Sequence, residues 1–358
     1  MGIINMTEYG LLGKFEAYAS EYSSQYKVAR ILSQERGIYR IISIDGERLG
    51  EVSGKLRYNA CCASDFPAVG DFVLIDSECE HDNAVISKVL PRSSVFVRKA
   101  AGRANEEQVV AANIDTVFIC MSLNNDFNLR RLERYLSVAW DSGAAPVIVL
   151  TKSDLCNELN NRLRDVESVA LGTDIVLTSG IEDDGYASLL PYIKAGKTVA
   201  FIGSSGVGKS TLINRLLGEE RLETNGLRND DKGRHTTTRR ELFLLKGGGM
   251  VIDTPGMREL GLWDAEDGLD KTFSDIEGLA AKCRFADCTH SSEPGCAVKQ
   301  AIASGVLSEA RWHSYQKLVN ENRYTECNAD YLAEKRKKFK NIAKTNKYNM
   351  KERSDVHV

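Results

Sequence analysis

The stretch FIGSSGVGKST, residues 201–211, restricts the possible folds of this chain more than any other feature. It fits the phosphate-loop pattern G-x-x-x-x-G-K-[ST] at Gly203, Gly208, Lys209 and Ser210. An apolar run, KTVAFI, precedes the pattern, and a helical stretch, TLINRLLG, follows it. A glycine-rich turn that arose by chance would not need a preceding strand, a following helix, or the lysine and serine of the pattern. The sequence therefore predicts a nucleotide-binding α/β domain.

The phosphate-loop pattern assigns a task to each of its residues. Backbone N–H groups of such a loop face the phosphates at the N-terminus of the following helix. Lys209 is expected to reach the β- and γ-phosphates, and Ser210 to bind the Mg²⁺ that accompanies the nucleotide. The residues expected to surround the phosphates are Gly203, Ser204, Ser205, Gly206, Val207, Gly208, Lys209, Ser210 and Thr211.

A second phosphate motif, VIDTPG, follows at residues 251–256. Asp253 ends an apolar strand and is expected to hold the magnesium ion through water. The backbone N–H of Gly256 is placed to detect the γ-phosphate. The same letters also make a good turn by themselves, but the phosphate loop upstream favours the D-x-x-G motif of a nucleoside triphosphatase.

The segment between these motifs, GLRNDDKGRHTTTRR at residues 226–240, has the composition of a mobile switch loop. Thr237 is the predicted magnesium ligand of this loop. Met257 stands where many GTPases carry a glutamine that orients the attacking water, so intrinsic turnover should be slow. His235 is the candidate catalytic residue, because a neutral imidazole can orient or deprotonate water. The alternative is an ordinary solvated histidine.

The stretch VLTKSDLC, residues 149–156, resembles a guanine-reading motif with threonine in place of the usual asparagine. Asp154 can accept both N–H groups on the Watson–Crick edge of guanine, and adenine lacks that donor pair. Thr151 replaces the amide that contacts the ring, which should soften the affinity. LTSG at residues 177–180 is a second base loop or only a turn. The predicted base-site residues are Thr151, Lys152, Ser153, Asp154, Thr178 and Ser179.

The order of these motifs is unusual. In an ordinary GTPase the guanine-reading motif follows the phosphate loop, whereas here it ends well before Gly203. A sheet does not depend on where the chain enters it, provided that the old termini lie close together at the surface. All the loops would still lie at the carboxyl ends of strands, where open α/β sheets bind ligands. The sequence therefore predicts a circularly permuted GTPase domain that uses GTP with Mg²⁺.

Periodicity divides the rest of the chain. Short runs rich in β-branched and aromatic residues predict a small barrel, with an oligonucleotide-binding (OB) barrel as the leading interpretation. Buried strands alternating with helices follow, as in a parallel sheet covered on both faces. The barrel strands are expected at 39–44, 50–58, 70–76 and 83–90, the central strands at 115–123, 145–155, 174–180 and 197–203 with a hairpin over 240–256, and a helix at 128–143.

A cysteine cluster lies near the start of the polar, helical stretch that follows residue 273. KCRFADCTHSSEPGCAV contains Cys283, Cys288, His290 and Cys296, which together suit one closed, structural zinc site. Unmetallated core cysteines are the alternative. The odd total of nine cysteines fits a reducing compartment. No basic leader or long apolar run is visible, so a cytoplasmic protein without a membrane segment is expected.

Taken together, these motifs resemble those of the circularly permuted, small-ribosomal-subunit-dependent GTPases, the bacterial RsgA/YjeQ family. The stretches AANIDTV, TKSD, GSSGVGKST, GRHTTTRREL and DTPGMREL and the cysteine cluster carry the resemblance over roughly residues 28–325. It implies an OB-fold, a permuted GTPase domain and a helical zinc-binding domain. It also implies that the small subunit stimulates hydrolysis, that the protein acts late in subunit maturation, and that the family's proposed catalytic histidine is His235.

The expected multidomain organisation has five segments. They are an N-terminal extension (1–27), the OB-fold barrel (28–102), the permuted GTPase domain (103–268), the zinc-binding helical domain (269–335) and a basic tail (336–358). We expect a monomer that contacts the small subunit and its rRNA. Basic barrel residues suit that partner, although solvated surface charge is the alternative. These residues are Arg30, Arg36, Arg40, Lys55, Arg57, Arg92, Arg98 and Lys99.

Two other functions are compatible with parts of the pattern. One is a P-loop kinase for a small molecule with a structural zinc lid. Asp154, in its context at the end of a strand, argues against it. The other is a binding module with a vestigial nucleotide site, and intact Lys209, Ser210 and Asp253 argue against that.

Overall fold

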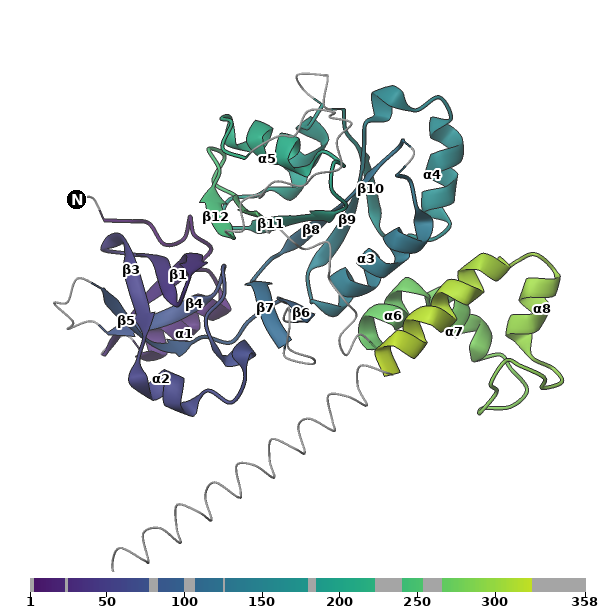
Figure 1. Ribbon diagram of the computed structural model, residues 1–358, viewed down its shortest axis with the longest axis horizontal. Coiled ribbons are helices and arrows are strands. Elements are labelled where there is room, and N and C mark those ends of the chain that lie inside the picture. Colours follow the sequence, from purple (N-terminus) through teal and green to yellow (C-terminus); the bar gives the residue numbers. More distant parts are fainter. Residues whose placement is uncertain are drawn as a thin grey trace, which may run out of the picture.

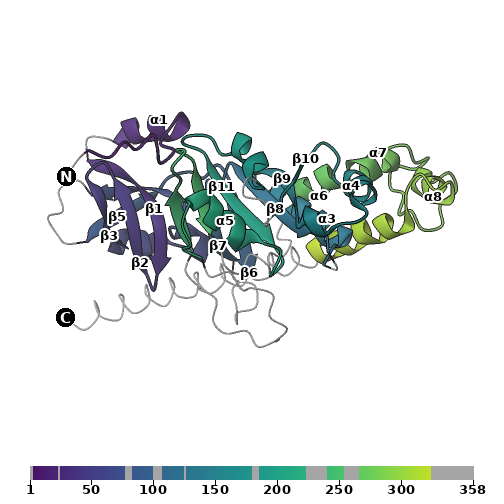
Figure 2. The same ribbon diagram turned by 90° about the horizontal axis from the view of Figure 1, so that it is seen from above.

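The computed structural model describes residues 3–22, 25–76, 83–99, 107–124, 126–179, 185–222, 240–253 and 266–323. They form a β-barrel, a central α/β region and a helical region (Figure 1). Figure 2 shows these parts following one another along the length of the molecule, with the α/β region in the middle. The predicted multidomain architecture is confirmed.

The barrel is built from five strands: β1 (Tyr26–Glu35), β2 (Ile38–Ser43), β3 (Gly46–Val52), β4 (Phe72–Asp76) and β5 (Ala84–Val89). They hydrogen-bond in the order β1-β2-β3-β5-β4, and a further pairing of β1 with β4 closes the barrel. Closure removes the free sheet edges of a small β domain. Alternate inward residues such as Ile31, Ile41, Val73 and Ile86 fill the interior and are fully buried.

One predicted barrel strand is wrong in its second half. Residues 50–58 were expected to be extended, but β3 ends at Val52 and the helix α2 (Gly54–Asn59) follows, with a short 3-10 helix (Ala63–Asp65) after it. The reason is a helix cap: the Ser53 hydroxyl accepts a hydrogen bond from the backbone N–H of Leu56 at 3.1 Å.

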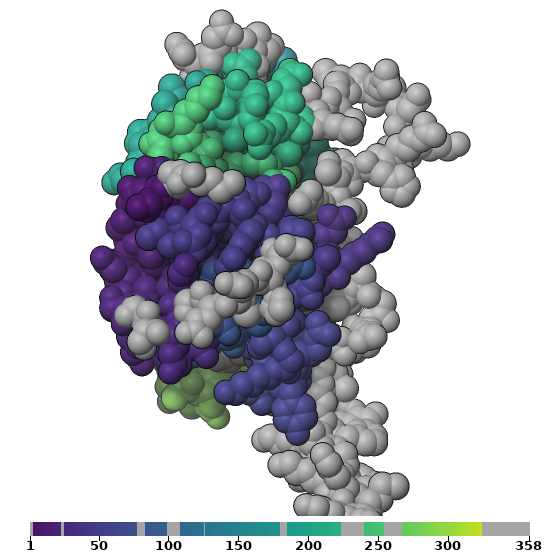
Figure 3. Space-filling model, turned by 90° about the vertical axis from the view of Figure 1, so that its left-hand side faces the viewer, coloured from purple at the N-terminus to yellow at the C-terminus, as the bar shows by residue number. Residues whose placement is uncertain are grey.

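The N-terminal segment packs on the barrel. Its helix α1 (Lys14–Tyr22) buries Phe15, whose ring lies 4.5 Å from that of Phe72 between centroids. Upstream, the backbone N–H of Ile4 donates to Ile44 O at 3.1 Å. Figure 3 shows the purple N-terminal residues lying directly against the blue barrel surface. The segment predicted as an extension therefore forms part of the barrel's packing.

The central sheet follows the order β10-β9-β8-β11-β13-β12, and all neighbours are parallel except the β12–β13 pair. Its inner strands are almost wholly buried, as expected when helices cover both faces, whereas the edge strand β10 is only partly buried. The predicted parallel α/β domain is confirmed. The strands are β8 (Thr116–Ser122), β9 (Ala145–Thr151), β10 (Asp174–Leu177), β11 (Thr198–Gly203), β12 (Glu241–Leu244) and β13 (Met250–Asp253).

Helices cover the two faces of this sheet separately. Residues of α3 (Leu129–Asp141) and α4 (Leu159–Glu167) share one apolar cluster with the sheet. Residues of α5 (Lys209–Leu217) and of the 3-10 helix Ala187–Tyr192 share another. A further short 3-10 helix, Ser153–Leu155, follows β9.

Two connections join the barrel to the central sheet. The hairpin of β6 (Val95–Lys99) and β7 (Glu107–Ala112), which the sequence pattern did not predict, lies between them along the chain. Strand β1 also pairs with β12 through Ser33 and Glu241, so barrel and sheet share hydrogen bonds.

The helical region contains α6 (Glu266–Thr272), α7 (Ser274–Ala280), α8 (Ala297–Ala303) and a helical stretch over 309–323. Helix α6 packs closely on α3, because a Cβ at Gly268 would lie only 2.1 Å from Ser137 O. Among the residues that the structure describes, no helix combines the length and apolar character needed to cross a bilayer.

Candidate functional site

The phosphate loop lies between β11 and α5, as its sequence requires. Gly208, the residue before the helix, has φ 100°, a left-handed conformation that favours glycine. At the start of the loop, a Cβ on Gly203 would meet Cys120 O at 2.3 Å. The Lys209 ammonium folds over the loop and donates to Gly203 O at 2.8 Å and Ser204 O at 2.6 Å. The loop is therefore a preformed backbone turn with its cation in place.

The guanine-reading motif begins where β9 ends, and it contacts the phosphate loop directly. The Thr151 hydroxyl, which is buried, donates to Val207 O at 2.6 Å. Lys152 adopts the left-handed conformation at φ 59°, and its ammonium donates to Gly206 O at 2.8 Å. Hydrogen bonds from side chain to backbone thus join two motifs that are far apart in the sequence.

The second predicted base loop lies beside the first. Ser179 donates from its hydroxyl to Asp154 Oδ1 at 2.8 Å, which orients a carboxylate that is otherwise exposed. The backbone N–H and hydroxyl of Ser153 donate to Thr178 O at 3.3 and 3.2 Å. The structure therefore brings Asp154 and the LTSG loop together. The carboxylate faces solvent in a fixed orientation, as a group that recognises paired N–H donors must.

Asp253 ends β13, which pairs in parallel with β11, the strand that leads into the phosphate loop. Burial raises the pKa of Asp253 to about 6, the charge of Lys209 opposes this shift, and Glu241 adds to it. A buried carboxylate is stabilised by a cation. Together with the hydroxyl of Ser210 at the start of α5, it offers the oxygen ligands that Mg²⁺ prefers.

Three predicted site residues lie outside the described residues. They are His235 and Thr237 of the switch loop and Gly256 of the D-x-x-G motif. Their predicted roles stay predictions. The remaining predicted phosphate and base residues all gather at the carboxyl ends of the parallel strands β9, β10, β11 and β13.

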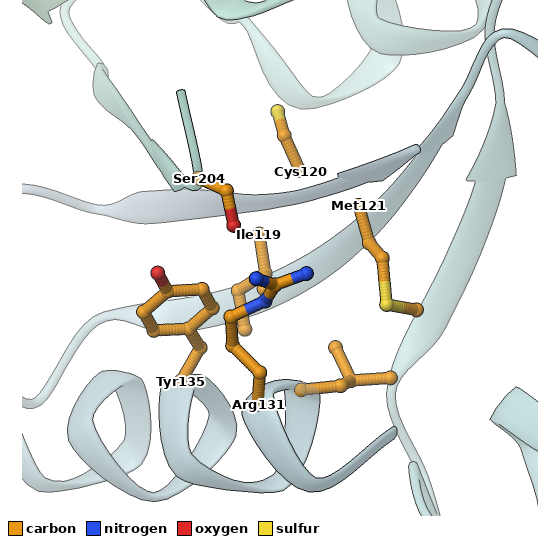
Figure 4. A pocket seen from close by; sticks show the side chains of 7 residues that line it. Ile119, Cys120, Met121, Arg131, Tyr135 and Ser204 are labelled. Carbon is orange, nitrogen blue, oxygen red and sulfur yellow. The ribbon is translucent and has the colours of Figure 1, made fainter. Parts of the chain in front are cut away.

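A small pocket beside the phosphate loop was not predicted. Figure 4 shows Arg131 and Tyr135 projecting from α3 toward Ser204. Arg131 also pairs with Asp126, its Nη2 lying 2.8 Å from Oδ1. Only the fold brings α3 to Ser204, so no local sequence signal marks this contact. The lining residues are Ile119, Cys120, Met121, Arg131, Leu132, Tyr135 and Ser204.

The four predicted zinc ligands converge. The ligand atoms of Cys283, Cys288, His290 and Cys296 all lie within 4.8 Å of one another. Tetrahedral zinc, with bonds of about 2.3 Å to sulfur and 2.0–2.1 Å to nitrogen, requires separations of about 3.8 Å between sulfurs and 3.6 Å between sulfur and nitrogen. The Sγ atoms of Cys283 and Cys296 are 3.9 Å apart, and His290 Nδ1 lies 3.6 and 3.4 Å from them. The donor set therefore fits zinc, with His290 binding through Nδ1.

Residues around the cluster hold its loop in shape. Glu293 accepts from the backbone N–H groups of Thr289, Ser291 and Ser292 at 2.9–3.0 Å. The Trp312 ring packs edge-on against His290, with centroids 5.5 Å apart. The sequence did not mark these supporting residues, because glutamate and tryptophan are no metal signature. They leave the four ligands little freedom to move.

Comparisons with known proteins agree with this geometry. A family model described as RsgA GTPase matches residues 89–263. A relative from Lactiplantibacillus plantarum, named small ribosomal subunit biogenesis GTPase RsgA 2, is 50% identical over 330 residues, covering 92% of this chain and 92% of the relative.

Solved structures show the same architecture. YjeQ from Thermotoga maritima has a TM-score of 0.61 and 27% identity, covering 83% of this chain and 98% of its own. YloQ, described as a circularly permuted GTPase, has a TM-score of 0.59 and 24% identity, covering 83% and 95%. The permuted fold predicted from the motif order is confirmed.

Proposed function

This chain belongs to the RsgA GTPase family, and from that premise we propose that it binds the small ribosomal subunit and couples GTP hydrolysis to late maturation of that subunit. The name of the relative from Lactiplantibacillus plantarum supports this partner. We propose a cytoplasmic monomer with one structural zinc ion and with Mg²⁺ bound alongside GTP.

One observation carries the nucleotide part of the proposal. The Thr151 hydroxyl binds Val207 O, so the base loop and the phosphate loop form one continuous surface at the edge of the sheet. A nucleotide lying on this surface would place its base at Asp154 and its phosphates at the N-terminus of α5. Ser179 keeps the carboxylate oriented.

Different groups of this chain have different roles in GTP hydrolysis. The phosphate-loop N–H groups and Lys209 stabilise the charge of the β- and γ-phosphates. Ser210, Asp253 and Thr237 would hold Mg²⁺, which neutralises phosphate charge when bound. His235 orients or deprotonates the attacking water, since Met257 cannot. With this set alone turnover is slow, and contact with the ribosomal subunit accelerates it.

The barrel supplies a surface that suits rRNA. Helix α2 exposes Lys55 and Arg57 beside Tyr58, whose side chain is 85% exposed. Basic groups bind phosphates, and an exposed aromatic ring offers a stacking platform for an unpaired base. The assignment of two predicted residues to this surface is wrong. Arg30 is fully buried, and Arg92 pairs with the buried Asp71 at 2.7 Å, so neither is available to RNA.

The base assignment is tested by changing the donor pattern that Asp154 reads. Asp154→Asn should bind GTP poorly and accept xanthosine triphosphate, whose base offers an acceptor where guanine offers a donor. Turnover of both nucleotides by the parent and the variant measures the switch. A variant that still prefers GTP would contradict the role of Asp154, and a parent that prefers ATP would contradict the whole nucleotide assignment.

A further inference from the structure

A single row of residues crosses the sheet from the barrel to Asp253. Strand pairing places Arg40 of β2 opposite Ser33 of β1, and Ser33 opposite Glu241 of β12. Glu241 in turn lies opposite Asp253, the last residue of β13. Residues directly opposite one another in antiparallel strands point to the same face of a sheet. The four side chains therefore lie along one face of a sheet that runs without interruption from the barrel into the GTPase region.

A β-bulge in β1 sets this alignment. The pairing of β1 with β2 shifts between Ile31 and Ser33, so that Leu32 is an extra residue and Ser33 faces Arg40. Bulges of this kind redirect side chains and recur next to active sites. Ser33 is small and 1% exposed, so a longer side chain from β2 can reach across β1.

The Arg40 guanidinium makes that crossing and pairs with Glu241. Its Nη2 lies 2.5 Å from Glu241 Oε1, and its Nε lies 2.8 Å from Oε1 of Glu47, which belongs to the barrel. The Glu241 side chain is 17% exposed, whereas that of Glu47 is 48% exposed. Because solvent and salt weaken exposed ion pairs, the stronger of the two pairs is the one that joins the barrel to the GTPase sheet.

Glu241 is also a second carboxylate beside Asp253. Like charges directly opposite each other in a ladder repel. Burial is the largest cause of the raised pKa of Asp253, the charge of Lys209 opposes this shift, and the charge of Glu241 adds to it. The two carboxylates therefore lie between two cations, Arg40 on the barrel side and Lys209 on the phosphate-loop side. Arg40 approaches Glu241 from the side opposite Asp253.

We propose that Arg40 is a positioning residue for GTP hydrolysis, because it holds the Glu241 carboxylate away from Asp253 and so leaves Asp253 to the magnesium ion. The inference rests on the proposed function, in which Asp253 helps to hold the Mg²⁺ that accompanies GTP. Without its cation, Glu241 would repel Asp253 and draw the ion away from the phosphates. The barrel then contributes to hydrolysis through its own contact with the GTPase sheet, before any RNA is bound.

The test is GTP turnover by the full chain at saturating GTP and Mg²⁺, without ribosomal subunits. Arg40→Gln should lower kcat roughly five-fold, the effect of losing one partly exposed ion pair. Its binding of N-methylanthraniloyl-GDP without Mg²⁺ should stay at the parent level, because Asp253 acts on the nucleotide only through the ion. Arg40→Lys keeps the charge and should recover most of the rate. The matched control is Glu47→Gln, which removes the other partner of Arg40 and should turn over GTP at the parent rate.

A double-mutant cycle separates positioning from stability. Adding Glu241→Gln to Arg40→Gln leaves no unpaired carboxylate beside Asp253, so the double variant should turn over GTP faster than Arg40→Gln alone. A double variant that is no faster, or an Arg40→Gln variant with the parent kcat, would overturn the inference. If Arg40→Gln fails to fold, as judged by circular dichroism, Arg40→Met takes its place in the same cycle. A parent chain that hydrolyses no GTP would instead overturn the proposed function.

Discussion

At the scale of single residues, Arg30 shows how a charged side chain can serve the fold instead of a ligand. Its guanidinium is fully buried between the barrel and the central sheet, 4.8 Å from the Phe72 ring centre. Burial lowers the pKa of Arg30 to about 10, against the opposing effects of Asp115 and Asp71, so it stays charged near neutral pH. It donates to Tyr9 O, Gly70 O, Asn113 O and Thr198 Oγ1 at 2.5–3.4 Å.

Replacing this residue tests that role. Arg30→Met keeps an apolar stem but leaves several buried acceptors without a donor, so the free energy of unfolding should fall by roughly 2–4 kcal/mol. Urea denaturation followed by circular dichroism measures it. The matched control is Arg57→Met, at an exposed position of α2, which should change stability by less than about 0.5 kcal/mol. Equal losses from the two variants would show that Arg30 is not a structural cation.

The sequence identified correctly the residues that belong to short motifs. Lys209 and the four zinc ligands each belong to a short motif, and the structure gathers the members of each motif. The prediction that Arg30 contacts RNA was wrong, because its partners at residues 9, 70, 113 and 198 are distant in the sequence and no local pattern indicates them. The bond from Thr151 to Val207 was missed for the same reason.

At the scale of elements, α3 connects two parts of the molecule. Its Arg131 and Tyr135 point toward Ser204 of the phosphate loop (Figure 4). Between these two residues lies Glu133, which is fully buried and accepts from Arg311 at 2.9 Å and from Ser314 at 2.5 Å in the last described helix. The region that carries the Cys/His cluster is therefore fixed to the helix that borders the phosphate loop.

Glu133→Gln should loosen this junction. The variant keeps the size of the side chain but removes the charge partner of Arg311 on α3. Arg311 keeps its ion pair with Asp275, so the expected loss is that of a charged hydrogen bond, roughly 1.5–3 kcal/mol of unfolding free energy. The control is Arg134→Gln on the same helix. It breaks a partly exposed ion pair with Glu321, worth about 1 kcal/mol or less. Chemical denaturation of both variants provides the comparison, and losses of similar size would contradict the importance of the buried cluster.

Elements were predictable where periodicity was strong. The helix expected at 128–143 is α3, Leu129–Asp141, and each expected central strand is present. The strand expected at 145–155 was too long, because β9 ends at Thr151 and Ser153–Leu155 forms a 3-10 helix. The error at residues 50–58 arose because alternating letters over a short run cannot reveal the cap at Ser53, which starts a helix. The β6–β7 hairpin was missed because its strands are short and lie at a boundary between two patterns.

At the scale of the whole molecule, the permuted order places the helical region with the Cys/His cluster after the last strand of the GTPase sheet. The barrel and this helical region lie at opposite ends of the row in Figure 2, with the phosphate and base loops between them. Motif order predicted the permutation, strand patterning predicted the barrel, and the cysteine cluster predicted the last region. The packing between the regions, through Arg30 on one side and Glu133 on the other, depends on tertiary contacts that no motif encodes.

Removing the metal from the proposed zinc site should unfold only the helical region at the C-terminal end of the described chain. The ligands lie in a single loop before α8, so a chelator should unfold that region and leave the phosphate and base loops intact. Hydrogen exchange over residues 283–320 should rise, while binding of labelled GDP stays unchanged. Cys296→Ser should reproduce the effect, and Cys156→Ser, outside the cluster, should not. Undiminished protection after complete metal removal would show that the cluster does not support the fold.

The central claim is that this GTPase works on the small ribosomal subunit, and GTP turnover with purified subunits tests it most directly. The full chain alone should hydrolyse GTP slowly, and saturating small subunits should raise the rate at least roughly ten-fold, since a partner that completes a GTPase site has effects of this size or larger. Large subunits should have little effect, and Lys209→Ala should abolish the stimulated rate. A rate that small subunits leave unchanged, or that large subunits raise equally, would contradict the claim.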